Sequence, residues 1–357
     1  MEMFDSFRIG NYQAISLFGK AAPPEGLFTV SFTGDFGFWN RHPSPEAIRL
    51  QLEAEQPLLS RFDLRVINLE FILPGTGGGN ADLECESVAL SYLMDAGFQI
   101  VSLANNHAAA FGPEGLQHNV DKLEEAGISV IGLSDRRIHM FEKDGFHYGI
   151  YALTDLLDDA DPHGRVLRSR TEDVKNLHAE MDGLHTRIGF PHLGSRSVYP
   201  SPHEISQAGN LFDSGTDLLV CTGAHFAKGF VHLNGKPVCF GLGNHLFAWE
   251  GGGTEPVGMH LVASFDNGEL QQLFALPFHN TIMSGQTGPL DEKTFKAFSS
   301  ELADRSTTDT SRFYSDPRTQ EGAMERLRNL RLRDLINLRP RHVTYGLRAL
   351  FAKLMRR

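Results

Sequence analysis

Cysteine is scarce in this chain, with only three in 357 residues: Cys85, Cys221 and Cys239. None of them belongs to a Cys-x-x-Cys pair, so both a disulfide framework and a zinc-thiolate cage are excluded. Histidine is plentiful by comparison, with 16 residues. Any bound metal is therefore expected to be held by nitrogen and oxygen ligands.

Positive charge is also in short supply, because 33 Lys and Arg face 44 Asp and Glu and give a net charge of −11. Binding to nucleic-acid phosphates needs a basic surface, so nucleic acid is excluded as the main partner. One basic stretch stands out at residues 321–357, where ten Lys and Arg accompany three Asp and Glu.

Long hydrophobic runs are absent as well, and no window approaches the roughly 18 apolar residues of a membrane-spanning helix. The first residues, MEMFDSFRIGNYQ, lack the basic start, apolar stretch and small-residue cleavage site of a secretory signal. We therefore expect a cytoplasmic protein. The hydrophobic share of 41% and charged share of 22% are those of an ordinary globular chain.

Short apolar runs alternate with segments of helical spacing, which predicts an α/β fold. The expected strands are 27–33, 64–69, 99–103, 129–132, 148–153, 187–191 and 217–222, and the expected helices are 44–60, 84–97, 113–127, 171–183 and 202–215. Turn signals at Asp144-Gly145, Asn234-Gly235 and Asp266-Asn-Gly268 predict hairpins, and hence mixed sheets. The glycine-rich stretch 75–79 is expected to be a loop without the GK[ST] of a phosphate-binding P-loop.

The end of the chain is expected to differ from the body. Residues 304–316 are polar and suggest a linker, and Met324–Asn337 sets leucines against arginines as an amphipathic helix does. Pro340 ends that helix, and a second short helix is expected over 345–357. Residues 321–357 either pack on the body through their leucines or contact an anionic membrane surface or an acidic partner.

Polar residues follow five of the expected strands, at the strand ends where α/β proteins bind their ligands. Alone, each is explained by a turn or by a buried histidine bonded to the backbone. Together they offer the ligands of a divalent cation such as Zn, Mn or Fe. The five segments are Gly34-Asp35, Asn68-Leu-Glu70, Asn105-Asn106-His107, Pro191-His192 and Gly223-Ala-His225.

The order of these motifs resembles the capsule-synthesis protein A family (CapA, or PGA-cap), a branch of the calcineurin-like metallophosphoesterase superfamily. The resemblance covers roughly residues 27 to 285. It rests on FTGD (32–35), VINLE (66–70), DAGFQIVSLANNH (95–107), GPEGL (112–116), PHLG (191–194), Gln207, DSGTD (213–217), GAH (223–225) and GLGN (241–244).

The resemblance implies a four-layer α/β/β/α metallophosphatase-like sandwich over residues 27–285, with residues 1–26 as an extension and 286–357 as linker and helical tail. It also implies one or two divalent metal ions. His107 would then be the catalytic imidazole that protonates a leaving group or steadies an oxyanion. The implied metal ligands are Asp35, Glu70, Asn106, His192 and His225.

Several family positions differ in this chain. Ala110 stands where the family has Asp, Leu193 where it has Trp, and Arg196 where it has Glu. The late His-x-His motif is reduced to His225-Phe226-Ala227, so one imidazole is absent. Either the metal site persists in a weakened form, with His245 as a substitute ligand, or it has decayed into a binding site. The alternative for His245 itself is a partly buried strand residue.

Arg196 and Lys228 stand at two of the departing positions and are either solvent-facing charges or contacts for an anionic substrate, small or polymeric. With these candidate ligands we expect metal-dependent hydrolysis of a phosphoester or a γ-glutamyl amide, and the resemblance implies a link to poly-γ-glutamate or capsule metabolism. The alternative is a non-catalytic binding or assembly protein with a degenerate metal site.

Overall fold

The computed structural model describes residues 4–38, 44–70, 87–110, 112–155, 161, 164–194, 198–248, 256–280 and 285–306. All of them belong to one unit, Met1–Thr310, and a second unit, Ser311–Arg357, falls outside the described residues. The expected loop at 75–79 and both expected tail helices therefore lie outside the described residues, as does most of the expected linker.

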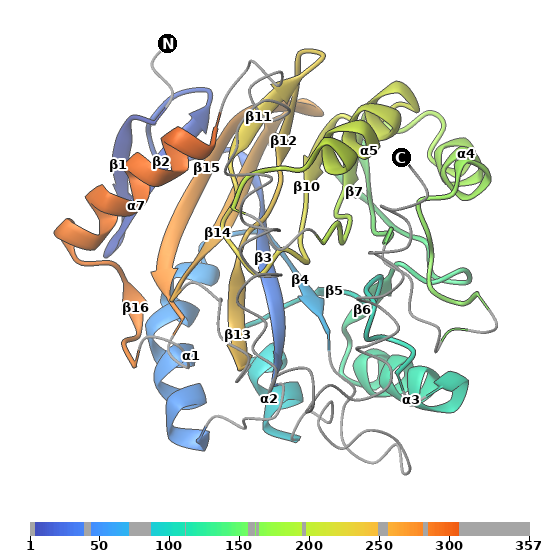
Figure 1. Ribbon diagram of the computed structural model, residues 1–357, viewed down its shortest axis with the longest axis horizontal. Helices are drawn as coiled ribbons and strands as arrows, with labels where there is room; N and C mark the ends of the chain where they lie inside the picture. The colour runs from blue at the N-terminus through green and yellow to red at the C-terminus, as the bar shows by residue number, and fades with distance from the viewer. Residues whose placement is uncertain are drawn as a thin grey trace, which may run out of the picture. The chain divides into compact units, whose positions relative to one another are not determined.

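The first sheet joins ten strands within the described part of the chain (Figure 1). The strands of its parallel part coincide with apolar runs of the sequence, because a strand that is covered on both faces consists mostly of apolar residues. It consists of β3 (Phe28–Phe38), β4 (Leu64–Leu69), β5 (Ile100–Ser102) and β6 (Ser129–Ile131), with β13 (Asn244–Ala248) beside β3. The antiparallel part consists of β1 (Ser6–Ile9), β2 (Tyr12–Phe18), β14 (Val257–Asp266), β15 (Glu269–His279) and β16 (Gly288–Pro289).

The second sheet is also mixed, and its strand order is β11-β12-β10-β9-β8-β7. Hairpins close its two edges at Asp144-Gly145 and Asn234-Gly235, where both residues have positive φ as a type I′ turn requires. These are two of the predicted hairpins. The strands are β7 (Ile138–Lys143), β8 (Phe146–Tyr151), β9 (Thr186–Gly189), β10 (Leu218–Val220), β11 (Phe230–Leu233) and β12 (Lys236–Cys239).

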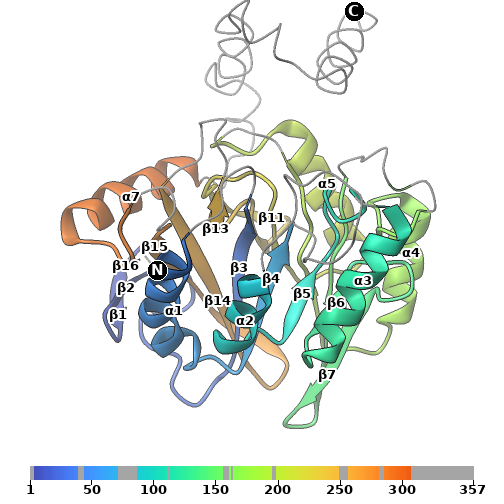
Figure 2. The same cartoon turned by 90° about the horizontal axis from the view of Figure 1, so that it is seen from below.

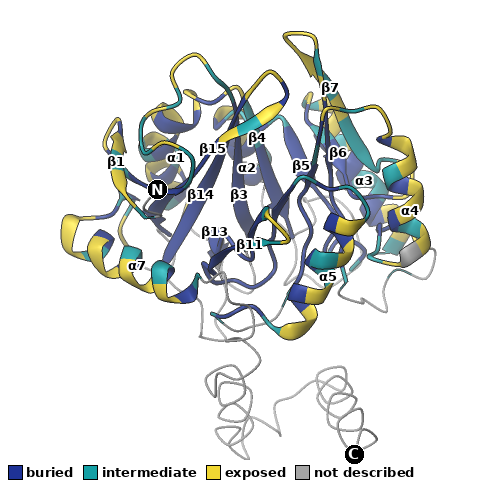
Figure 3. Ribbon diagram, turned by 90° about the horizontal axis from the view of Figure 1, so that it is seen from above, coloured by how far each residue is buried: buried dark blue, intermediate teal, exposed yellow. Residues whose placement is uncertain are grey.

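Helices cover the outer faces of the two sheets, which pack against each other (Figure 2). Side chains alternate along β4: Val66 joins Ile188 of the second sheet in the inter-sheet core, and Ile67 packs on the helical side. α1 (Pro45–Leu59), α2 (Ser87–Asp95) and α3 (Gly112–Glu125) cover the first sheet, and α4 (Thr171–Glu180) and α5 (Pro202–Asp213) cover the second. The buried residues lie along these two sheets and the inward helix faces (Figure 3).

This arrangement is the predicted four-layer α/β/β/α sandwich with mixed sheets. The ends of the body differ from the prediction, because the first 26 residues contribute β1 and β2, and β2 pairs with β15. After residue 285 the chain adds β16 and α7 (Glu292–Arg305), whose Phe295, Phe298 and Leu302 enter the inter-sheet core. Among the described residues, no helix is both long and apolar enough to cross a membrane.

Candidate metal centre

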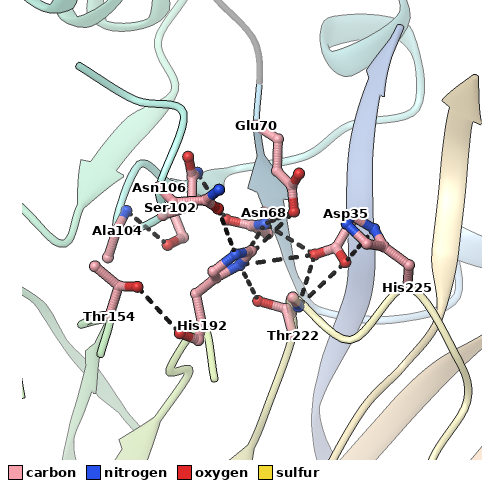
Figure 4. Close-up of polar contacts among 12 residues, drawn as sticks. Asp35, Asn68, Glu70, Ser102, Ala104, Asn106, Thr154, His192, Thr222 and His225 are labelled. Atoms are coloured by element: carbon pink, nitrogen blue, oxygen red, sulfur yellow. Dashed lines mark hydrogen bonds and ion pairs between the residues drawn. The ribbon is translucent and has the colours of Figure 1, made fainter. Parts of the chain in front are cut away.

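All five predicted ligands meet at one edge of the sandwich (Figure 4). Asp35 lies in β3, Glu70 follows β4 and Asn106 follows β5, and these three strands run in parallel. His192 and His225 follow β9 and β10, which are parallel neighbours in the second sheet. Residues far apart in the sequence therefore converge because the carboxyl ends of both sets of strands open at the same place.

Asp35 is held at the centre of this strand-end site and is only 1% exposed. The backbone N–H of Gly223 donates to both carboxylate oxygens, at 3.2 and 3.1 Å, and Asn68 Nδ2 donates to Oδ1 at 2.9 Å. His225 Nδ1 lies 3.3 Å from Oδ2. Burial alone would raise the pKa of Asp35, but the hydrogen bond and charge of His225, with the charge of His192, lower this pKa below its usual value.

Asn68 connects the ligands to one another although it is not among the predicted ligands. Besides Asp35, its Nδ2 lies 3.3 Å from Glu70 Oε1 and 3.2 Å from His192 Nδ1. Asn105 in turn donates to Asn68 Oδ1 at 3.1 Å and to the carbonyl oxygen of Leu69 at 2.8 Å. These two buried amides fix the positions of the side chains around them.

The two nitrogens of His192 have different roles. Nδ1 accepts from Asn68 Nδ2 and lies 3.1 Å from Thr222 Oγ1, and Nε2 lies 3.1 Å from Asn106 Oδ1. Because the amide oxygen of Asn106 can only accept, Nε2 carries the proton in this arrangement. Burial lowers the pKa of His192 to about 4, with the charge of Asp35 acting in the opposite direction, so the ring is neutral at neutral pH.

His225 occupies a backbone conformation that few side chains adopt. Its φ is +61°, in the left-handed region, and φ of Gly223 before it is +89°. A Cβ on Gly223 would lie 2.8 Å from the ring of His192, so glycine is required there. Asn244 Oδ1 lies 2.9 Å from His225 Nδ1, and the ring of Phe247 packs 4.6 Å from the His225 ring. Strained backbone of this kind is concentrated at functional sites.

The approach of β13 to β3 places Asn244 beside His225. The backbone N–H of Asp35 donates to the carbonyl of Gly243 at 3.2 Å. A Cβ built on Gly34 would lie 1.9 Å from that same carbonyl oxygen. The two strands can therefore come this close only because residue 34 has no side chain.

His107 lies beside the predicted ligands, and its side chain is 19% exposed. Its Nε2 is 3.2 Å from Asn106 Nδ2 and 3.9 Å from Glu70 Oε2. Its backbone N–H donates to Asn105 Oδ1 at 3.0 Å, which fixes the loop after β5. The imidazole thus combines contact with the site and access to solvent, as a proton-transferring group requires.

The residues at this edge fit a divalent cation. Asp35, Glu70 and His225 are buried, and each offers one ligand atom within 4.8 Å of the others. The Oδ1 of Asn106 adds a neutral oxygen beside them. The Nε2 of His192 adds a neutral nitrogen once its proton moves to Nδ1, where Thr222 Oγ1 can accept it. Carboxylate, amide and imidazole ligands together suit Mn, Zn or Fe.

Lys228 is not a solvent-facing charge, because its side chain is fully buried. Its Nζ forms an ion pair with Glu204 Oε1 at 2.5 Å. Glu204 also completes the capping box of α5 by accepting from the backbone N–H of Ser201 at 2.7 Å. Lys228 is thus a structural partner of α5. Arg196, the other predicted anion contact, lies outside the described residues.

His245 does not replace the missing imidazole. Asn244 reaches the strand-end site, and the next side chain along β13 points to the opposite face, toward the helices. There His245 Nε2 lies 2.7 Å from the hydroxyl of Tyr92 and 3.4 Å from Glu55 Oε2. The structure thus agrees with a strand histidine and contradicts a substitute ligand. The reduced motif ends at Ala227, which is fully buried in the inter-sheet core.

Comparisons with known proteins agree with this fold and site. The family profile described as bacterial capsule synthesis protein PGA_cap matches residues 29–248, which include every candidate ligand. A capsule biosynthesis protein CapA from Bacillus anthracis is 22% identical over 187 residues, which cover 47% of this chain and 44% of that protein. The match thus spans less than half of that relative's length.

A solved structure shares the fold at low sequence identity. A candidate 5′-nucleotidase from Staphylococcus aureus, solved in complex with alpha-ketoglutarate, matches with a TM-score of 0.51 and 14% identity. The match covers 78% of this chain and 58% of that one. The fold is thus the metallophosphatase-like one, and the profile match over more than half of the sequence shows that the chain belongs to the bacterial capsule synthesis protein (PGA_cap) family.

Proposed function

We propose that the protein is a metal-dependent hydrolase that cleaves a phosphoester or a γ-glutamyl amide in capsule-type metabolism. The observation that carries the proposal is the meeting of five predicted ligands beside a solvent-accessible imidazole. When bound, a divalent ion lowers the pKa of water and polarises a phosphoryl or acyl oxygen near neutral pH. Asp35, Glu70, Asn106, His192 and His225 would hold the ion.

The chain's own groups divide the remaining tasks. Asn68 and Asn105 fix the ligand side chains, and Asn244 orients His225. His107 would give a proton to the leaving group at Nε2 or hold the developing negative charge. The substrate is expected to be anionic, small or polymeric. A phosphoester carries a negative phosphate and a γ-glutamyl chain carries negative carboxylates, so substrates of both proposed reactions are negatively charged.

A second candidate function is a non-catalytic binding or assembly protein. It is favoured by the reduced motif His225-Phe226-Ala227, in which a methyl group packed in the core stands where the family has an imidazole. Loss of a ligand weakens metal binding steeply. In this case the site would bind an anionic polymer or a partner without turnover.

One experiment separates the two functions. The full chain is stripped with chelator, reloaded with Mn²⁺, Zn²⁺ or Fe²⁺, and assayed on p-nitrophenyl phosphate, bis-p-nitrophenyl phosphate and γ-glutamyl-p-nitroanilide. A hydrolase releases p-nitrophenol or p-nitroaniline only when metal is present, and His192→Asn abolishes this release. His279 is a buried histidine of β15 outside the site, so the control variant His279→Gln should leave the release intact. Metal binding without turnover on any of these substrates, or no metal binding at all, overturns the hydrolase and leaves the binding protein standing.

Residues 321–357 lie outside the described residues, so the membrane or acidic-partner contact expected of them is a separate proposal. Their excess of basic residues supports it. Co-sedimentation with anionic vesicles, compared between the full chain and one ending at residue 320, tests it. Equal sedimentation of the two chains would exclude a role for these residues in membrane contact.

A further inference from the structure

A second cluster of ligand-type side chains lies inside the molecule, on the helix-facing side of the first sheet. Glu55 comes from α1, His245 from β13 and His260 from β14, and all three side chains are 0% exposed. The strand-end site takes Asn244 from the same strand, but His245 faces the other way. The two clusters are therefore separate and share no side chain.

The spacing within this buried cluster is that of a coordination shell. His245 Nε2 lies 3.4 Å from Glu55 Oε2, and His260 Nε2 lies 3.5 Å from Glu55 Oε1. The three residues each offer a ligand atom within 4.8 Å of the others. In a tetrahedral zinc site with bonds of about 2.0–2.2 Å, ligand atoms lie roughly 3.3–3.5 Å apart. Both imidazole-to-carboxylate distances match that spacing. Binding an ion would require the proton of His245 Nε2, which faces the Tyr92 hydroxyl at 2.7 Å, to move to Nδ1.

The charge of Glu55 is the second reason to look for a cation here. Among the described residues, no lysine or arginine pairs with Glu55; its partners are Gln51, Tyr92 and the two histidines. Burying a carboxylate without a compensating positive charge is costly. A divalent ion between the carboxylate and the imidazoles would supply that charge.

The surrounding residues aim the ligand atoms inward. Thr33 Oγ1 lies 2.9 Å from His260 Nδ1, which turns His260 Nε2 toward Glu55. This buried Nε2 has no hydrogen-bond partner within the segments that the structure describes. Tyr92 donates to Glu55 Oε2 at 2.9 Å and thereby orients the carboxylate. The ring of His245 is fixed by the rings of Phe36 and Phe98 around it. Such outer contacts are typical of metal-bound imidazoles and carboxylates.

We propose that Glu55, His245 and His260 bind a divalent cation of the Zn²⁺ class in a closed structural site, distinct from the strand-end centre. The three ligands tie α1 to β13 and β14, so the ion would lock a helix to the sheet. Because every ligand is buried, the ion enters before the core closes and is retained afterwards.

The test uses the full chain with Asp35→Asn and His192→Asn, so that zinc at the strand-end site is removed and failure of the proposed function cannot affect the result. The protein is produced in zinc-supplemented medium and gel-filtered with a weak chelator, and its metal is counted. This double variant is expected to retain about one zinc per chain. Adding His260→Gln lowers the retained zinc about tenfold or more, and adding His279→Gln leaves it unchanged.

Two results would overturn the proposal: a folded double variant without zinc, or equal zinc with and without His260→Gln. If the His260→Gln chain does not fold, X-ray absorption at the zinc edge of the double variant decides. Two imidazoles with carboxylate oxygen support the site, and any other shell refutes it. Without a metal, Glu55, Tyr92 and His245 would form only a buried hydrogen-bond network. A folded double variant that contains no zinc would show that this is the case.

Discussion

Replacing Asn244 with leucine tests whether the hydrogen bond to His225 prepares the strand-end site for metal. Asn244 Oδ1 lies 2.9 Å from His225 Nδ1, and Asn244 Nδ2 has no hydrogen-bond partner in the described part of the chain. The substitution therefore removes one interaction and leaves no new donor or acceptor unsatisfied on residue 244. His225 keeps its contact with Asp35 Oδ2 at 3.3 Å.

The expected loss of stability can be compared with the expected loss of metal affinity. A neutral hydrogen bond contributes about 0.5–1.5 kcal/mol to folding, so Asn244→Leu should lower the free energy of unfolding by no more than that. Removing a group that orients a metal ligand costs about 10–100-fold in affinity, or roughly 1.4–2.8 kcal/mol. Metal affinity should therefore fall by more than stability does.

The affinity is measured by titrating the chelator-stripped chain with Mn²⁺ and counting free ion by its EPR signal, and stability by urea unfolding. Asn244→Asp keeps an acceptor at the same place and is the matched control, and Ser264→Ala of β14 controls for buried polar loss elsewhere. An affinity for Asn244→Leu within about twofold of the original chain, with normal affinity in both controls, would show that this bond does not orient His225.

Three further predictions concern other parts of the molecule. Lys228→Met leaves the Glu204 carboxylate without its buried ammonium and should lower the unfolding free energy by about 3–5 kcal/mol; Lys228→Met with Glu204→Gln should recover part of this in urea titrations, and equal losses would refute the pairing. His107→Ala should lower kcat about 10²–10⁴-fold with little change in Mn²⁺ affinity, and an unchanged kcat would exclude proton transfer by this ring. Burial, with the charge of Arg187, lowers the pKa of His178 to about 4. Since the unfolded chain protonates this histidine near its usual value, stability should fall as the pH drops from about 6.5 toward 4, and less so in His178→Gln. Parallel pH profiles for the two chains would contradict this.

The parallel strands could be predicted because their surroundings are simple. A strand such as Leu64–Leu69 is covered on both faces, so its sequence is an apolar run that ends where the site begins. The same reasoning finds the five polar segments after these runs, and the family resemblance selects the ligands within them: Asp35, Glu70, Asn106, His192 and His225. The convergence needed only the general geometry of parallel sheets.

The predictions that were wrong concern residues whose neighbours in space come from distant parts of the sequence. The sequence suggests His245 as a substitute ligand just after Asn244, but alternation along β13 places it against Glu55, 190 positions earlier in the chain. Lys228 is buried because Glu204 is brought to it by α5. Neither contact has a local signature in the sequence.

One omission did have a local signal. Residues 286–357 are predicted from the sequence to be a linker and tail, with no helix at α7. Yet Phe295, Phe298 and Leu302 repeat at helical spacing after Asp291, which accepts from two backbone N–H groups as an N-cap. The amide scaffold of Asn68 and Asn105 was named only as part of two motifs. Its connecting role depends on side-chain geometry that spacing does not encode.

The lack of a side chain at Gly34 has a consequence for random mutagenesis of this position. Even alanine would force the carbonyl of Gly243 to retreat, and with it the asparagine that steadies the late imidazole. A saturation library selected for function should thus return glycine alone at codon 34, whereas the neighbouring core positions accept several aliphatic residues.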